Sequence, residues 1–159
     1  MRYSKLVQME ARHIILLVED NASDIWHFRK VARQANLVNH IHVVETGEEA
    51  IRYLAGEGKY SNRDKFPMPV LVFLDLKLPR ISGFGVLKWI EANILPAESR
   101  VVVLAGVADN LKQVKEAYKL GAQTFLVKPL TKPDFVNSLN GVRGIRLVRV
   151  DTGLYVDAA

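Results

Sequence analysis

Cysteine is absent from this sequence of 159 residues. Without a thiol the chain can form no disulfide and can offer no thiolate to a metal, and cysteine usage says nothing about its redox compartment. No apolar stretch approaches the ~18 residues that a membrane-spanning helix needs. The opening residues, MRYSKLVQMEARH, lack the apolar segment of a secretory signal. We therefore expect no membrane partner and a cytoplasmic location.

Charge of one sign is not concentrated in any arm or tail. The 22 Lys and Arg residues exceed the 17 Asp and Glu residues, which gives a formal net charge of +5, but they are scattered along the chain. Two stretches are locally basic, 112–119 and 143–149. Such stretches are typical of solvated faces or of surfaces that meet an acidic protein, so we expect no nucleic-acid partner.

Apolar residues gather instead in five short runs. These runs are nearly continuous in Val, Ile and Leu, which is typical of strands in a sheet that is covered on both faces. The runs are residues 13–18, 40–44, 69–76, 100–105 and 124–128. Amphipathic segments of helical length follow them, at 22–36, 48–54, 83–92, 110–120 and 132–139. The alternation predicts an α/β fold, a doubly wound five-stranded parallel sheet with helices on both faces.

Acidic residues stand at the ends of two of these strands. Glu19 and Asp20 end the first strand, and Asp75 ends the third. The carboxyl ends of parallel strands meet in one crevice, where three carboxylates repel one another unless a cation neutralises them. An isolated acid after a strand is often only a helix cap, but their joint occurrence favours a site. Oxygen ligands with no His or Cys nearby suit Mg²⁺ or Mn²⁺.

Lys128 follows the last buried strand and precedes Pro129. From that position its ammonium group can reach the same crevice and pair with Asp75 or with a phosphoryl oxygen. A surface lysine that merely ends a strand is the plainer alternative.

These motifs together resemble the receiver domains of response regulators. The resemblance rests on LLVEDN, LVFLDLKLPRISG, VVVLAG and LVKPL, and it covers residues 13 to 141. VEDNASD, the GEGKYSNR loop and LDLKLPR make the chain most similar to single-domain receivers found beside bacterial phytochromes. The resemblance implies a flavodoxin-like strand order, 2-1-3-4-5.

The resemblance also implies a role for each matching residue. Asp75 is expected to accept a phosphoryl group and Lys128 to pair with it. Asp20 is expected to bind Mg²⁺ directly, together with Asp75 and the backbone carbonyl of Lys77, while Glu19 acts through water. Phe125 takes the position of the aromatic switch residue.

One position departs from the family pattern. Receivers place Thr or Ser at the end of the fourth strand, where the hydroxyl group bonds the phosphoryl oxygen, and this chain has Ala105 followed by Gly106. We therefore expect phosphorylation and output to be loosely coupled.

The expected organisation is an N-terminal tail at 1–12, a receiver at 13–143 and a C-terminal extension at 144–159, with no output domain. The extension has two β-prone runs around a Gly-containing turn, which favours a hairpin, with a continued final helix as the alternative. The expected partners are a histidine kinase or phosphotransfer protein and a downstream protein target, and a homodimer stays open.

The resemblance implies a signalling domain and no enzyme beyond self-catalysed phosphorylation and dephosphorylation. A pseudo-receiver that acts as a constitutive interaction or dimerisation module is the first alternative. A phosphohydrolase of a related fold is the second, but such enzymes need an Asp two residues after the nucleophile, where this chain has Lys77.

Overall fold

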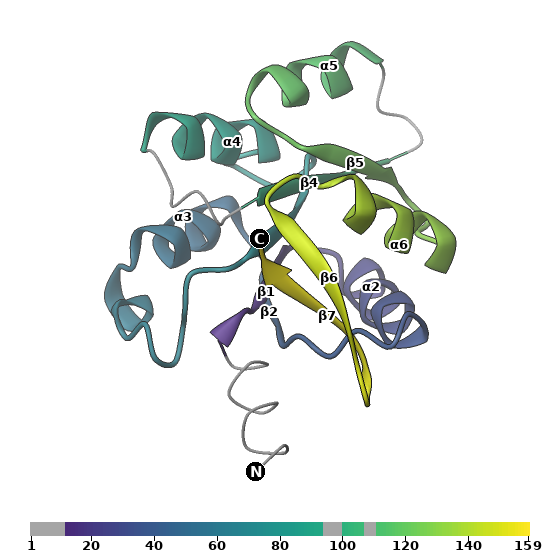
Figure 1. The fold of residues 1–159 in the computed structure, drawn as a ribbon. Helices are drawn as coiled ribbons and strands as arrows, with labels where there is room; N and C mark the ends of the chain where they lie inside the picture. Colours follow the sequence, from purple (N-terminus) through teal and green to yellow (C-terminus); the bar gives the residue numbers. More distant parts are fainter. Residues whose placement is uncertain (1–11, 94–99, 107–110) are drawn as a thin grey trace.

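The computed structural model describes residues 12–93, 100–106 and 111–159. Five strands form the main sheet: β1 (Ile15–Val18), β2 (Ile41–Val44), β3 (Leu71–Asp75), β4 (Arg100–Ala105) and β5 (Thr124–Val127). The α-helices are α2 (Ala22–Gln34), α3 (Gly47–Ala55), α4 (Gly83–Ala92), α5 (Leu111–Lys119) and α6 (Lys132–Gly141). A 3₁₀ helix, η1 (Gly58–Ser61), and two further strands, β6 (Ile145–Val150) and β7 (Gly153–Ala158), complete the described elements (Figure 1).

The main sheet has the order β2-β1-β3-β4-β5, and every neighbouring pair in it is parallel. The prediction of a doubly wound sheet in flavodoxin-like order is therefore confirmed. The predicted strands and helices begin or end within two residues of the observed bounds. Asn110, the predicted first residue of one helix, lies outside the described residues, as does nearly all of the predicted tail at 1–12.

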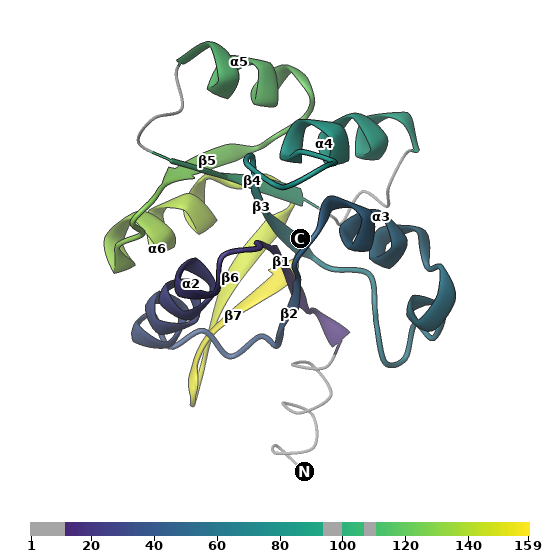
Figure 2. The ribbon, with the colours of Figure 1, turned by 180° about the vertical axis from the view of Figure 1, so that it is seen from behind.

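Helices cover both faces of this sheet because the strands are apolar on both faces. Along β1, Leu16 and Val18 belong to one core, while Ile15 and Leu17 belong to the other. The first core also holds side chains of α3, α4 and α5, and the second holds side chains of α2 and α6. Figure 2 shows the two sets of helices on opposite sides of the strands. The continuous apolar runs thus reflect burial on both sides.

Polar side chains define where four of the helices begin. Asn21 accepts a hydrogen bond from the backbone N–H of Asp24 at the start of α2, and Thr46, Ser82 and Thr131 do the same for α3, α4 and α6. Such caps satisfy backbone donors that the first helical turn leaves unpaired. The cap of α2, Asn21, directly follows Glu19 and Asp20, so it also fixes the loop at the end of β1.

The polar stretch between α3 and β3 is more ordered than its composition indicates. It contains η1, in which Tyr60 is buried. Arg63 donates hydrogen bonds to the carbonyl oxygens of Tyr53 (2.7 Å) and Leu54 (2.9 Å), the last turn of α3. A cation at the carbonyl end of a helix is favourable, and it ties this stretch to the helix.

The last two strands form an antiparallel hairpin on the side of the sheet that α2 and α6 cover (Figure 1). The alternative of a continued final helix is wrong, because α6 ends at Gly141. Val156 of β7 is fully buried in the core that α2 and α6 share. Asn39, 5% exposed, donates to the carbonyl oxygens of His13 (2.7 Å) and Val156 (2.9 Å) and accepts from the N–H of Val156 (2.7 Å). The hairpin is thereby fixed to the body of the domain.

Among the described residues no helix combines the length and the apolar character needed to cross a membrane.

Candidate functional site

The carboxyl ends of β1, β3 and β5 bring together residues that are far apart in the sequence. Glu19 directly follows β1, Asp75 is the last residue of β3, and Lys128 directly follows β5. Because β1, β3 and β4 are adjacent in the sheet and β5 borders β4, these ends lie at one edge. Ligand sites of doubly wound sheets lie at this edge, beyond the strand ends.

Three carboxyl groups meet at this edge. One oxygen each from Glu19, Asp20 and Asp75 lies within 4.8 Å of the other two. Glu19 and Asp75 are buried, at 1% and 3% exposure, whereas Asp20 is exposed. Within the described ranges this is the one group of at least three His, Cys, Asp or Glu residues that could hold a metal ion. A donor set made only of carboxylate oxygens, open to solvent on one side, fits a hard divalent cation such as Mg²⁺ or Mn²⁺.

The ammonium group of Lys128 lies in the same crevice. Its Nζ donates to Asp75 Oδ2 at 3.0 Å, to Glu19 Oε2 at 3.1 Å and to Asp24 Oδ2 at 3.0 Å. The contact with Asp75 is the one that the sequence predicts. The contact with Asp24 is not predicted from the sequence. Asp24 lies in the first turn of the helix that starts next to Asp20, and this position is the signal that could have indicated the contact.

The crowding of these charges changes their proton affinities. Burial, together with the nearby carboxylate of Asp75, raises the pKa of Glu19 to about 7. Burial alone lowers the pKa of Lys128, but the hydrogen bonds that its ammonium group donates to Asp24, Asp75 and Glu19 outweigh burial and raise that pKa above its usual range. Lys128 is therefore a fixed positive charge beside the buried carboxyl groups.

Backbone groups hold the two buried carboxylates in place. The N–H of Lys77 donates to Asp75 Oδ1 at 3.0 Å, and the N–H of Asn21 donates to Glu19 Oε1 at 3.2 Å. Gly83, the first residue of α4, approaches the strand end so closely that an added Cβ would lie 2.3 Å from the carbonyl oxygen of Asp75. The side chain of Lys77 is exposed, which fits the expectation that only its backbone faces the site.

Ala105 ends β4 beside Lys128, and Phe125 lies on the neighbouring strand β5. Ala105 is 2% exposed and ends β4, and its carbonyl oxygen accepts from the N–H of Lys128 at 2.8 Å. Its methyl group brings no hydrogen-bond donor to the crevice. The ring of Phe125 is 38% exposed and meets Tyr118 of α5 edge to face, with the ring centres 6.1 Å apart.

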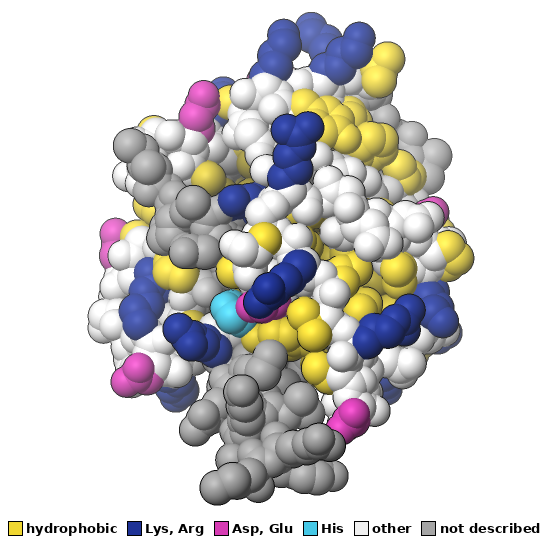
Figure 3. All heavy atoms as spheres, in the orientation of Figure 1, with side chains coloured by type: hydrophobic (Ala, Val, Ile, Leu, Met, Phe, Trp, Pro, Cys, Tyr) yellow, Lys and Arg dark blue, Asp and Glu magenta, His cyan; other side chains and the backbone are white. Residues whose placement is uncertain are grey.

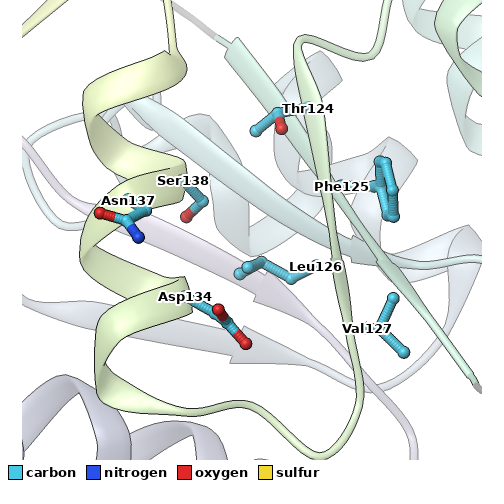
Figure 4. Close-up of a pocket in the computed structure, with 7 residues that line it drawn as sticks. All are labelled: Thr124, Phe125, Leu126, Val127, Asp134, Asn137 and Ser138. Atoms are coloured by element: carbon cyan, nitrogen blue, oxygen red, sulfur yellow. The ribbon is translucent and has the colours of Figure 1, made fainter.

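A separate groove of about 370 Å³ lies between β5 and α6. In Figure 4 Asp134, Asn137 and Ser138 of α6 form one wall, and Leu126 points toward them from β5. Phe125 lies on the opposite side of the strand, so it faces away from α6. The groove does not contain the three carboxylates or Lys128, and it is distinct from the acidic crevice.

Comparison with known proteins identifies the family to which the chain is similar. The profile of the response regulator receiver domain matches residues 15–140. The response regulator Rcp1 of Synechocystis sp. is 30% identical over 138 residues, which cover 86% of this chain and 90% of that protein.

Solved structures give the same result. The bacteriophytochrome response regulator AtBRR is 30% identical and covers 88% of this chain and 98% of its own, with a TM-score of 0.76. The Mn²⁺-bound form of Rcp1 is 31% identical over 81% of this chain and 90% of its own, with a TM-score of 0.66. The phosphorylated cyanobacterial phytochrome regulator RcpA is 30% identical over 82% of this chain and 90% of its own, with a TM-score of 0.67. From the matching profile, these relatives and the shared sheet order, the chain belongs to the response regulator receiver domain family of two-component signalling.

Proposed function

We propose that Asp75 accepts a phosphoryl group and that the chain signals by binding another protein in its phosphorylated form. The observation that carries this proposal is the position of Asp75, buried at a strand end between the acidic cluster and the ammonium group of Lys128. A phosphorylated relative, RcpA, supports it.

The reaction needs little covalent chemistry from the protein. A carboxylate oxygen of Asp75 attacks the phosphorus of the donor, the bond from phosphorus to the donor breaks, and the donor leaves with that electron pair. The product is an acyl phosphate, a known type of covalent intermediate for Asp. The residues of the site position Asp75 and balance charge, which is the main contribution of proteins to phosphoryl transfer.

We propose that Asp20, Asp75 and the backbone carbonyl of Lys77 hold Mg²⁺ or Mn²⁺ and that Glu19 acts through water. When bound, such an ion neutralises the carboxylates and the phosphoryl oxygens. Glu19 is buried, whereas its neighbour Asp20 is exposed to solvent, which supports a direct role for Asp20 and an indirect one for Glu19. The Mn²⁺-bound structure of Rcp1 supports the choice of ion.

The donor in this proposal is a histidine kinase or a phosphotransfer protein, and the output is a contact with a downstream protein. We place the receiver at residues 13–143 and treat 144–159 as an extension that is built into the same fold. Phe125 takes the role of switch residue, since it lies on β5, the strand that leads to Lys128, and its ring contacts Tyr118 of α5.

A second candidate function is a pseudo-receiver that binds or dimerises without phosphorylation. The observation that favours it is Ala105, which leaves the end of β4 without a hydroxyl group.

Incubation with phosphoramidate, with Mg²⁺ or with a chelator, separates the two candidates. The phosphoacceptor gains the mass of one phosphoryl group only when Mg²⁺ is present. An unchanged intact mass under both conditions contradicts the phosphoacceptor and favours the pseudo-receiver.

A further inference from the structure

Lys128 donates hydrogen bonds to three carboxylates, although the proposed reaction takes place only at Asp75. An ammonium group has three N–H donors. The structure assigns one carboxylate to each donor, Asp75 from β3, Glu19 from the end of β1 and Asp24 from α2, at 3.0 to 3.1 Å. Asp24 is not a member of the cluster that could hold a cation. Cation binding therefore does not explain why Asp24 contacts Lys128.

We propose that Asp24 is a positioning residue, which anchors the ammonium group of Lys128 in place while Asp75 gains and loses its phosphoryl group. The inference rests on the proposed phosphorylation of Asp75. It assigns to Asp24 a role that acts only through Lys128.

The first argument concerns the donors. When Asp75 becomes an acyl phosphate, its carboxylate loses its charge and the phosphoryl oxygens carry the negative charge instead. The N–H of Lys128 that pointed to Asp75 then turns to a phosphoryl oxygen, while the two contacts with Glu19 and Asp24 stay. Two unchanged contacts on different elements define the position of the ammonium group throughout the reaction, whereas without Asp24 only the contact with Glu19 stays unchanged.

The second argument concerns the space around the lysine. The side chain of Lys128 is 20% exposed. Leu17, Phe28 and Leu104 line, together with Lys128, a cavity of only about 10 Å³. This volume is close to the minimum for a single water molecule. The aliphatic part of the side chain thus has little room, and the anchors at its tip decide where the charge lies.

The third argument concerns the exposure of Asp24. Its side chain is 39% exposed, compared with 1% for Glu19 and 5% for Asp75. Asp24 therefore lies at the outer side of the crevice and holds the lysine toward the opening, where a phosphoryl donor arrives. Loss of this contact lets the two buried carboxylates draw the ammonium group inward.

Asp134 offers a matched control. It occupies the same position in α6 as Asp24 does in α2, the first turn, with its N–H bonded to the capping side chain. Asp134 is exposed and forms no hydrogen bond or ion pair with Lys128 among the contacts of the described residues. Asp134→Asn therefore reproduces the change in helix charge without the change at Lys128.

The test measures the rate at which the full chain takes up a phosphoryl group from phosphoramidate at saturating Mg²⁺. We expect Asp24→Asn to lower this rate roughly tenfold, since small misplacements of a catalytic group are costly. Asp134→Asn should stay within about twofold of the parent chain. In a Lys128→Ala background Asp24→Asn should change the residual rate by less than about twofold, because nothing is left to position.

A second measurement does not depend on phosphorylation. The side-chain ammonium signal of Lys128 in NMR should exchange its hydrogens with water several-fold faster in Asp24→Asn than in the parent chain or in Asp134→Asn. If the parent chain takes up no phosphoryl group, the proposed function is wrong, and this signal still decides whether Asp24 anchors the lysine. Equal exchange in all three chains, or an equal effect of Asp24→Asn with and without Lys128, overturns the inference.

Discussion

Glu19 and Asp20 are neighbours in the chain but differ in their surroundings. Glu19 is buried and accepts hydrogen bonds from Lys128 and Asn21, whereas Asp20 is exposed at the mouth of the cluster. We predict that Asp20→Asn weakens Mg²⁺ binding roughly 10- to 100-fold and that Glu19→Gln weakens it only a few-fold, because a direct ligand contributes more than one that acts through water. Isothermal titration with Mg²⁺ checks this difference. Equal losses in both variants contradict the division of roles.

The raised pKa of Glu19 gives a prediction about pH. A carboxyl group whose pKa is about 7 in the folded chain and 4.5 in the unfolded chain binds its proton more tightly in the folded state. Between these two values the folded state holds more protons, so the free energy of unfolding falls as the pH rises. Without divalent cations, we expect stability to fall by roughly 1 to 3 kcal/mol between pH 5 and pH 8.

Urea unfolding at several pH values, in the presence of a chelator, checks this prediction, and Glu19→Gln is its control. The variant carries no titrating group at this position and should show a flatter profile. A profile equally steep in both chains means that another group causes the pH dependence.

At the scale of elements, the end of β4 departs from the pattern that receivers show, because Ala105 stands where they place Thr or Ser. Ala105 lies beside Lys128 and offers a methyl group instead of a hydroxyl group. A hydroxyl that bonds a phosphoryl oxygen only in the active state contributes roughly 1.5 to 3 kcal/mol to the switch. We predict that Ala105→Thr enlarges the response of β4, α5 and Phe125 to phosphorylation.

Hydrogen exchange at 100–106 and 111–127, with and without phosphoramidate, measures this response. Ala105→Val is the control, because valine has nearly the shape of threonine but no hydroxyl group. If the parent chain already responds as strongly as Ala105→Thr, or if Ala105→Val responds equally, another group supplies the coupling.

The buried side chain of Asn39 helps to join the hairpin of β6 and β7 to the rest of the domain. Asn39 forms three hydrogen bonds, which join β7 and the start of β1. We predict that Asn39→Ala lowers the free energy of unfolding by roughly 2 to 4 kcal/mol, because it leaves buried backbone groups of His13 and Val156 without this partner. Chemical denaturation measures the loss, and Asn140→Ala, on the exposed surface of α6, should change stability by less than about 0.5 kcal/mol. A loss in Asn39→Ala no larger than in the control means that the hairpin does not depend on Asn39.

For the whole molecule, the main sheet and the acidic crevice follow from the sequence because their signals are local. Apolar runs on both faces specify buried parallel strands, and the carboxylates stand at the ends of those strands. Asp24 could not be assigned in the same way, since a first-turn acid is usually explained by helix capping and its contact with Lys128 spans 104 positions. The packing of the hairpin could not be assigned from the sequence either, because it involves a contact between Asn39 and Val156, which are far apart in the chain.

The distribution of charged and apolar side chains over the surface is a property of the whole molecule. Figure 3 shows Lys and Arg side chains spread over this face of the molecule. Among the described residues the large apolar side chains that are exposed lie mostly on α5 or β5, namely Leu111, Tyr118, Phe125 and Val127, and Trp26 lies on α2. A partner that senses phosphorylation at Asp75 would meet these elements if Phe125 has the proposed switch role.

The central claim is that Asp75 is the phosphoacceptor, and the most direct test compares the parent chain with Asp75→Asn. Both are incubated with phosphoramidate and Mg²⁺, and acid-labile phosphate is measured by intact mass and by peptide mapping. Asp151→Asn, in the turn of the hairpin, is the control for a loss of surface charge. We predict one labile phosphoryl group in the parent chain and in Asp151→Asn, located on Asp75, and none in Asp75→Asn. Uptake by Asp75→Asn at the parental rate would contradict the assignment.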